Sequence, residues 1–321
     1  MARRWVNFVT ESAYKTGSGT LFDNTTLGTK WLPIELSADD DWNPVWMPDR
    51  EAVKTALASA KTERHVGTTS SLTASLRTLL YPAQDDLLVG WGFNRINSGQ
   101  TSPWTTTEPV GDCASAIFAW GITDDTNTLT KYRGDGFKVQ SMEVAMSRST
   151  LGGAAVLSAQ LVGSQRIAAI GQDVEPTTLT YYPSTAPYHL TECALTVNGT
   201  VHQNYDSVTV GVENDLIVRK DNRTYAQPIR AFGRSVKIQV SKLFTISPDI
   251  EALYLSRNAC SNCTLVMTHA TSPTLTFDLK AQARITDYKR ALPLSDVHGE
   301  SYTVEAFFDR VATTDAVASF T

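Results

Sequence analysis

The sequence is poor in the residues that build disulfide frameworks and metal centres. It holds 4 cysteines and 5 histidines in 321 residues, too few cysteines to cross-link a chain of this length. Cys260 and Cys263 have the C-x-x-C spacing of zinc and redox sites, but neither a second such pair nor a paired-histidine motif accompanies them. We therefore expect reduced thiols, no bound metal and no cofactor.

Catalytic motifs are also lacking. The sequence contains no H-E-x-x-H and no G-x-S-x-G, and the nearest match, residues 233–237, lacks the second glycine. The acidic run at 39–41 does not have the spacing of a calcium loop. We expect a protein that is not an enzyme, and a hydrolase with a dispersed active site is the least favoured alternative.

Two further absences concern charge and long apolar runs. Basic residues number 28 against 33 acidic ones, a net charge of −5, which argues against binding driven by nucleic-acid phosphates. No stretch has the length and hydrophobicity of a membrane span or a signal peptide. We expect synthesis and folding in a cytoplasm, without membrane insertion.

What the sequence does have is alternation of apolar and polar residues. It occurs at 208–212, 236–240, 275–279 and 302–308, and on both sides of a Ser-Thr-Leu-Gly-Gly turn within 131–164. A period of two is typical of strands with one buried face, so a mostly β, antiparallel fold is predicted. A change of phase near Ser141 predicts a β-bulge.

Three segments predict helices: residues 48–64, 82–90 and 248–256. Each begins with a proline followed by carboxylates, a common helix start. The spacing around Pro82 and Pro248 is similar, with apolar residues five to seven positions later in both. This similarity predicts an internal duplication, with a first domain at 1–166, a linker at 167–187 and a second domain at 188–321.

Two connections between expected strands, 41–67 and 215–233, are longer than hairpin turns and unusually apolar. They either fold back onto their own domain or dock on another subunit, and the second interpretation is favoured. The candidate docking residues are Trp42, Val45, Trp46, Met47, Leu216, Ile217, Val218 and Tyr225.

Five segments together resemble a known family. They are 11–17 (ESAYKTG), the hairpin at 131–164, 192–200 (ECALTVNGT), the strand–loop–strand at 212–244, and the closing segment 276–310. The chain resembles, over nearly its whole length, the major tail tube proteins of long-tailed, siphovirus-type bacteriophages in their two-domain, duplicated version. It departs from the family in the helix-like part of the first long loop and in the connection 94–112.

The resemblance implies two tandem β-sandwich or partly closed barrel domains, each with a short flanking helix. It implies that three chains join edge to edge in a pseudo-hexameric ring and that the long loops stack the rings into a tube. The tube would enclose the tape measure protein and later pass genomic DNA into the host without binding it specifically. Tail terminator and tail tip proteins would be further partners, and the tail would be assembled in the host cytoplasm.

A different class of function also suits a tandem β protein. A surface-binding or adhesion module of a virion or cell would use its loops to recognise a sugar or a protein. Exposed tryptophans are common sugar platforms, and the candidates for this role are Trp91, Trp104 and Trp120.

Overall fold

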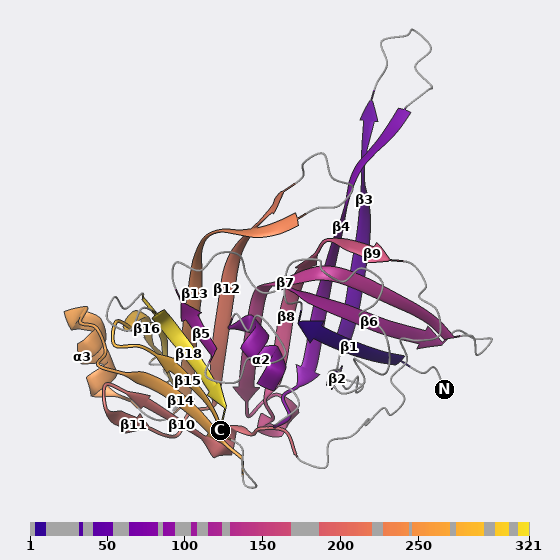
Figure 1. The fold of residues 1–321 in the computed structure, drawn as a ribbon. Coiled ribbons are helices and arrows are strands. Elements are labelled where there is room, and N and C mark those ends of the chain that lie inside the picture. Colours follow the sequence, from indigo (N-terminus) through magenta and orange to yellow (C-terminus); the bar gives the residue numbers. More distant parts are fainter. Residues whose placement is uncertain are drawn as a thin grey trace.

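In the computed structural model, the described residues lie mostly in antiparallel strands, which form one sheet of 12 strands and one of 6 (Figure 1). This confirms the mostly β fold class. The structure describes residues 4–10, 32–34, 41–53, 64–82, 86–93, 104–107, 115–123, 129–167, 186–219, 227–243, 246–269, 274–291, 299–307 and 314–320.

The elements have the following bounds. The larger sheet contains β1 (Arg4–Thr10), β2 (Leu32–Ile34), β3 (Asp41–Val53), β4 (Arg64–Leu79), β6 (Ala116–Thr123), β7 (Leu129–Ser147), β8 (Val156–Gly163), β9 (Gln165–Ile167), β12 (Ser207–Arg219), β13 (Gln227–Leu243), β16 (Arg284–Ala291) and β17 (Gly299–Glu305). The smaller sheet contains β5 (Trp104–Thr107), β10 (Cys193–Val197), β11 (Thr200–His202), β14 (Cys263–Thr268), β15 (Thr274–Leu279) and β18 (Thr314–Phe320). The helices are α2 (Asp86–Gly92), α3 (Pro248–Ser256) and the short 3-10 turns η1 (Leu151–Gly153) and η3 (Leu190–Glu192).

The predicted hairpin at 131–164 is confirmed as β7, η1 and β8. The bulge is confirmed as well, because the register of β7 against β8 shifts between Val139 and Ser141. The turn needs glycine: Gly153 has a φ of 102°, and a Cβ there would approach His189 Nε2 to 2.8 Å.

Two of the three helix predictions hold in whole or in part. Helix α3 spans the predicted residues 248–256, and α2 covers most of 82–90 but begins later. The helix predicted over 48–64 is wrong where the structure describes it, because 48–53 belong to β3 and Arg64 begins β4. Cross-strand pairing between β3 and β4 overrides the local helix propensity, and Pro48 suits an edge strand as well as a helix start.

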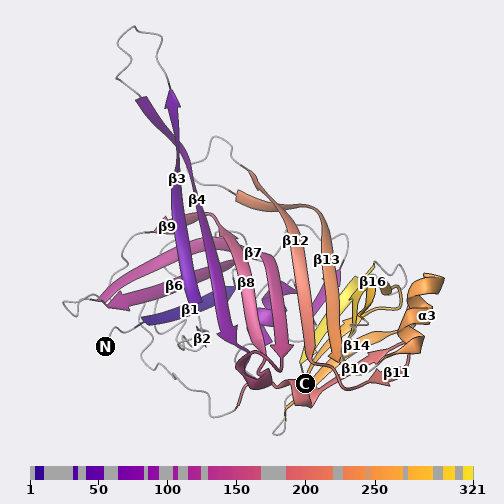
Figure 2. The same cartoon turned by 180° about the vertical axis from the view of Figure 1, so that it is seen from behind.

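Eight strands lie side by side in the order β3-β4-β8-β7-β12-β13-β17-β16 (Figure 2). The row crosses the middle of the chain, since β7 before the predicted linker pairs with β12 after it. Among the described residues, the strands at its ends, β3 and β16, each pair on one side only. The first part of β7 leaves the row and pairs with β6 and β9.

Pairing order recurs along the chain. In the first half, the β3–β4 hairpin pairs through β4 with β8, and β8 pairs with β7. In the second half, the β12–β13 hairpin pairs through β13 with β17 in the same way, and β17 pairs with β16. Likewise β2-β1-β6-β7-β9 parallels β11-β10-β14-β15-β18, while β5 crosses over to pair with β18. Residues 168–185 of the predicted linker lie outside the described residues, and the division into two domains stays a prediction.

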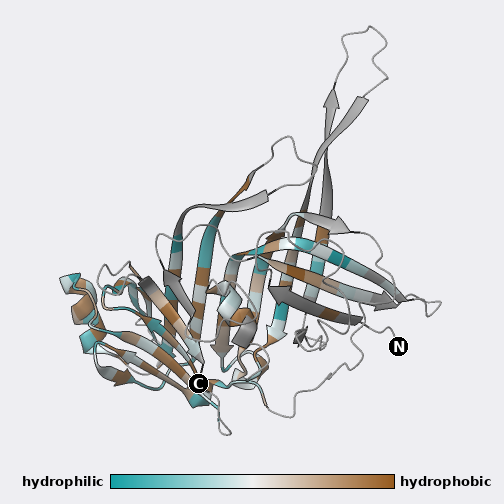
Figure 3. Cartoon of the chain, in the orientation of Figure 1, coloured by the Kyte–Doolittle hydropathy of each residue, from teal (hydrophilic) through white to brown (hydrophobic). Residues whose placement is uncertain are grey.

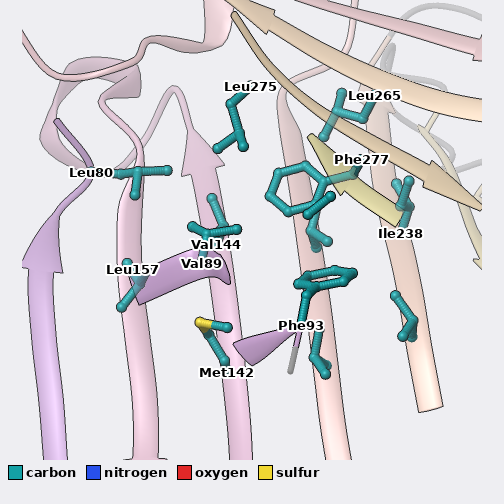
Figure 4. Packing of buried hydrophobic residues seen from close by; sticks show 14 of the residues in the cluster. Leu80, Val89, Phe93, Met142, Val144, Leu157, Ile238, Leu265, Leu275 and Phe277 are labelled. Atoms are coloured by element: carbon teal, nitrogen blue, oxygen red, sulfur yellow. The ribbon is translucent and has the colours of Figure 1, made fainter. Parts of the chain in front are cut away.

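The core extends through both halves of the chain. Hydrophobic bands alternate with polar ones along the strands (Figure 3), and the buried residues form one cluster. Helix α2 lies between the two sheets, where Val89 is fully buried. At its end, Phe93 packs on Phe277 of β15 with ring centroids 5.8 Å apart, so side chains from the two halves meet there (Figure 4).

Candidate assembly surfaces

One face of the eight-strand row is polar. Along β12, Val208, Val210 and Val212 are buried, while the residues between them are exposed or half-buried. The same alternation in β4, β7, β8, β13 and β17 brings polar side chains to this face. The polar positions are Thr73, Ser75, Arg77, Ser141, Glu143, Ser158, Gln160, Thr209, Glu213, Ser235, Lys237, Gln239, Ser301, Thr303 and Glu305. We call this surface the polar face.

Charges of both signs are interleaved on the polar face. Six positions lie directly opposite one another from strand to strand and form one row across it. They are, in order, Arg77, Ser158, Glu143, Gly211, Lys237 and Glu305. Like charges are never neighbours in this row, so repulsion within it is small.

Where β7 pairs with β12, two hydrogen bonds of the Asn214 side chain, which we call the clamp, link the two halves of the chain. The Asn214 Nδ2 group donates to the backbone oxygen of Val139 at 2.8 Å, and Arg234 Nε donates to Asn214 Oδ1 at 2.7 Å. Asn214 is buried, so these bonds join β12 to the bulged part of β7. A polar hollow of about 650 Å³ opens beside the clamp, lined in part by Gln160 and Glu213.

The two long connections are extended hairpins rather than loops. Residues 41–53 and 64–67 belong to β3 and β4, and 215–219 and 227–233 belong to β12 and β13. The β3–β4 hairpin projects beyond the rest of the molecule (Figure 1). The expectation of long loops is wrong for these residues, since pairing satisfies the backbone groups that a loop would leave to water.

The candidate docking residues fall into different environments. Trp42 packs on its own chain, with its ring stacked 4.7 Å from Phe118. Val45 and Ile217 are exposed, at 38% and 52%. The remaining described candidates are half-buried or are placed only by their strand: Leu216 and Val218 in β12, and Trp46 and Met47 in β3. Tyr225 lies outside the described residues.

The tryptophans expected as sugar platforms are mostly inside the protein. Trp91 and Trp120 are only 3% and 4% exposed, so the expectation of exposed rings is wrong for both. Trp120 instead stacks on Tyr132 with centroids 5.9 Å apart. Trp104 lies in β5, opposite Ala318. Burying a large aromatic ring stabilises the folded state, and in this fold Trp91 and Trp120 are core residues.

A buried polar cluster in the second half was missed by the sequence analysis. Lys242 Nζ donates to Ser247 Oγ at 2.7 Å, and the Ser247 backbone N–H donates to Glu300 Oε1 at 3.2 Å. On the other side, His202 Nδ1 lies 3.4 Å from Lys242 Nζ, and its Nε2 lies 3.3 Å from Asp249 Oδ2. The sequence does contain a signal for this cluster. Lys242 continues the alternating pattern of Val236, Ile238 and Val240, which places its side chain on the buried side of β13.

The three described cysteines, Cys193, Cys260 and Cys263, lack the features of a reactive site. Burial raises the pKa of both Cys260 and Cys263 above the ordinary value, which keeps them as thiols. Burial and then the Glu192 carboxylate raise the pKa of Cys193 to about 12. Within the described parts of the chain, no three His, Cys, Asp or Glu side chains are grouped to hold a metal ion.

The His202 side chain should make folding stability depend on pH. Burial, followed by the Lys242 ammonium, lowers the pKa of His202 below 6.5, and Asp249 opposes this only in part. The folded state therefore favours the neutral ring, and this contribution is present above about pH 6.5 and lost as the pH falls toward the lowered value. We expect the melting temperature to fall between pH 7 and pH 5 by more in the wild type than in His202→Gln. Equal slopes in thermal melts across this range would contradict the assignment.

No helix in the described ranges is long and apolar enough to cross a membrane. No protein-family model matches the sequence. The curated proteins contain no match to it either.

Proposed function

We propose that the protein is a structural virion component whose rings stack into the tail tube of a long-tailed bacteriophage. The observation that carries the proposal is the eight-strand row, which is continuous through both halves and whose end strands, β3 and β16, each have one unpaired edge within the described residues. Unpaired edges invite pairing with another chain, and a closed ring removes them. The tape measure protein, the tail terminator and the tail tip proteins are its proposed partners, and the virion tail, assembled in the host cytoplasm, is its proposed location.

The number of chains in a ring follows from the recurrent pairing order. If the two halves descend from a duplicated unit, one chain supplies two units. Three chains would then make a pseudo-hexameric ring. The β7–β12 junction within the chain is the model for the junction between chains, because both would join the row of one unit to that of the next.

The polar face is the proposed lumen wall. A duct for DNA must avoid firm phosphate binding, since each neutralised phosphate adds to affinity. In the row across the polar face, the basic residues Arg77 and Lys237 alternate with the acidic residues Glu143 and Glu305. Neither basic side chain therefore has another basic side chain beside it in the row. This distribution favours passage of DNA without specific binding.

Electron microscopy of the concentrated, purified protein tests the proposal. We expect rings with a central hole that stack into tubes, and threefold symmetry in averaged end views. Particles that remain dispersed, also after addition of a tail initiator complex, would count against the tube and favour the surface-binding module. Stacked rings with a symmetry other than threefold would agree with a tail tube but would contradict a ring of three chains.

Shortening the β3–β4 hairpin should separate ring formation from ring stacking. The change replaces residues 52–65 by an Asn-Gly turn, which then joins Glu51 to Val66, two residues that lie directly opposite each other. Since Trp42 and its contacts remain, we expect a folded protein that forms rings but no tubes. The measurement is negative-stain microscopy beside the wild type, and normal tubes would show that the projecting hairpin does not stack the rings.

A further inference from the structure

We propose that the corner between α3 and β16 is the docking site for a second copy of this chain, whose β3 edge lies along β16. The inference deepens the proposed function and rests on it, since it locates the junction between chains in the ring.

The corner carries apolar side chains that are exposed among the described residues. Leu255 of α3 is 71% exposed and Tyr254 is 36% exposed, with the Tyr254 ring 5.8 Å from that of Tyr288 in β16. A hollow of about 450 Å³ lies here, and Arg284 Nη1 donates to the Arg257 backbone oxygen at 3.2 Å within its rim. An exposed leucine beside an open hollow and the free edge of a strand is typical of a surface that a partner covers.

The matching helix of the first half shows what covers such a corner. Leu88 and Val89 of α2 follow Pro82 at the spacing at which Tyr254 and Leu255 follow Pro248. They are 2% and 0% exposed. Helix α2 contacts β7 of its own half and β18 of the following half, and Phe93 at its end packs on Phe277 of β15, so strands of the following half help to cover it. On α3 the corresponding side chains, Tyr254 and Leu255, stay exposed among the described residues, and another copy can supply the cover.

The two edges carry opposite charge along their sequences. Strand β16 contains Arg284, Lys289 and Arg290 against the single acid Asp287. Strand β3 contains Asp41, Asp49 and Glu51 against the single base Arg50. The edges attract each other, whereas each repels its own kind, so charge favours β16 against β3 over symmetric pairing.

Prolines limit how much the backbone can contribute to this junction. Pro44 and Pro48 in β3 have no N–H, so neither can donate to a ladder between β16 and β3. The apolar corner on α3 must therefore supply a large part of the affinity. In the second copy, β9 and the first part of β7 take the place over α3 that β18 and β15 take over α2 and Phe93.

The first experiment compares Leu255→Glu with Val201→Glu by sedimentation velocity over a range of concentrations. Val201 is 56% exposed on β11 and is the matched control. We expect the wild type and Val201→Glu to associate alike, and Leu255→Glu to need at least tenfold more protein. Thermal melts confirm that both variants fold. Undiminished association of Leu255→Glu would overturn the docking site, even if the wild type forms tubes.

The second experiment tests the pairing of edges by charge reversal. Lys289→Glu with Arg290→Glu should weaken association, as should Asp49→Lys with Glu51→Lys, and the chain with all four changes should regain it. Failure of the combined variant to recover would overturn the pairing of β16 with β3. Association that passes these tests without producing tubes would support the junction but contradict the tail tube. A wild type that stays monomeric at every concentration would overturn both.

Discussion

Replacing Lys242 by leucine should lower the free energy of unfolding by about 3–5 kcal/mol, the range for removing one partner of a buried charge pair. Lys242 is 2% exposed and lies directly opposite Glu300, which is 1% exposed. Burial lowers the pKa of Lys242, and the Glu300 carboxylate is the main group that opposes this shift. Without the ammonium, the buried carboxylate loses the charge opposite it in β13, and Ser247 Oγ loses its donor.

A double variant separates the value of the pair from the cost of an uncompensated charge. In β4 and β8, which take the places of β13 and β17 in the recurrent pairing order, Leu76 and Ala159 also lie directly opposite each other and are both buried. We expect Lys242→Leu with Glu300→Ala to recover most of the stability lost by Lys242→Leu alone. Urea denaturation of the three proteins measures both effects. If the free energy of unfolding of Lys242→Leu lies within about 1 kcal/mol of the wild-type value, the charged groups of the cluster are hydrated rather than buried.

Phe118→Ala should cost about 3–5 kcal/mol, the usual range for removing a buried phenylalanine ring. Phe118 is fully buried in β6 and is the centre of an aromatic cluster. Its ring lies 4.7 Å from Trp42, 5.2 Å from Phe137 and 5.6 Å from Trp91. The substitution leaves a cavity between these rings and removes three aromatic contacts.

The same substitution should loosen the base of the projecting hairpin. Trp42 lies near the start of β3, and its stacking on Phe118 attaches that strand to the core. Denaturant titration measures the loss of stability, and the tryptophan emission of the folded variant should move to longer wavelength. Phe118→Leu is the control, with an expected cost below about 2 kcal/mol because most of the volume remains. Equal costs for the alanine and leucine variants would contradict the role assigned to the ring contacts.

The strands and one helix could be predicted because their signals are local. Alternation in 208–212 and 236–240 predicts one buried face whatever the partner, and both segments are strands with the expected faces buried. Pro248 with its following carboxylates predicts α3 because the first turn of a helix needs no distant contact. The turn of the 131–164 hairpin is likewise determined by its glycines.

Pairing across the chain could not be predicted, and several individual side chains were misjudged for that reason. Residues 48–53 have helical composition but pair with β4, and Trp91 and Trp120 lie in a core that only the assembled sheets create. The sequence predicted the docking residues only in part. Val45 and Ile217 are exposed, as docking on another subunit requires, whereas Trp42 packs on Phe118 of its own chain.

The sequence by itself therefore determined that this protein is built from half-buried antiparallel strands, with hairpins too long for simple turns. Only the tertiary structure decided which strands meet: β7 beside β12, β5 beside β18, and β3 and β16 with no second neighbour among the described residues. The physical reason is that a period of two specifies which side of a strand is buried, but the backbone groups along its edges are the same in every strand. Which edge remains open, and with it the surface available for assembly, depends on the whole fold.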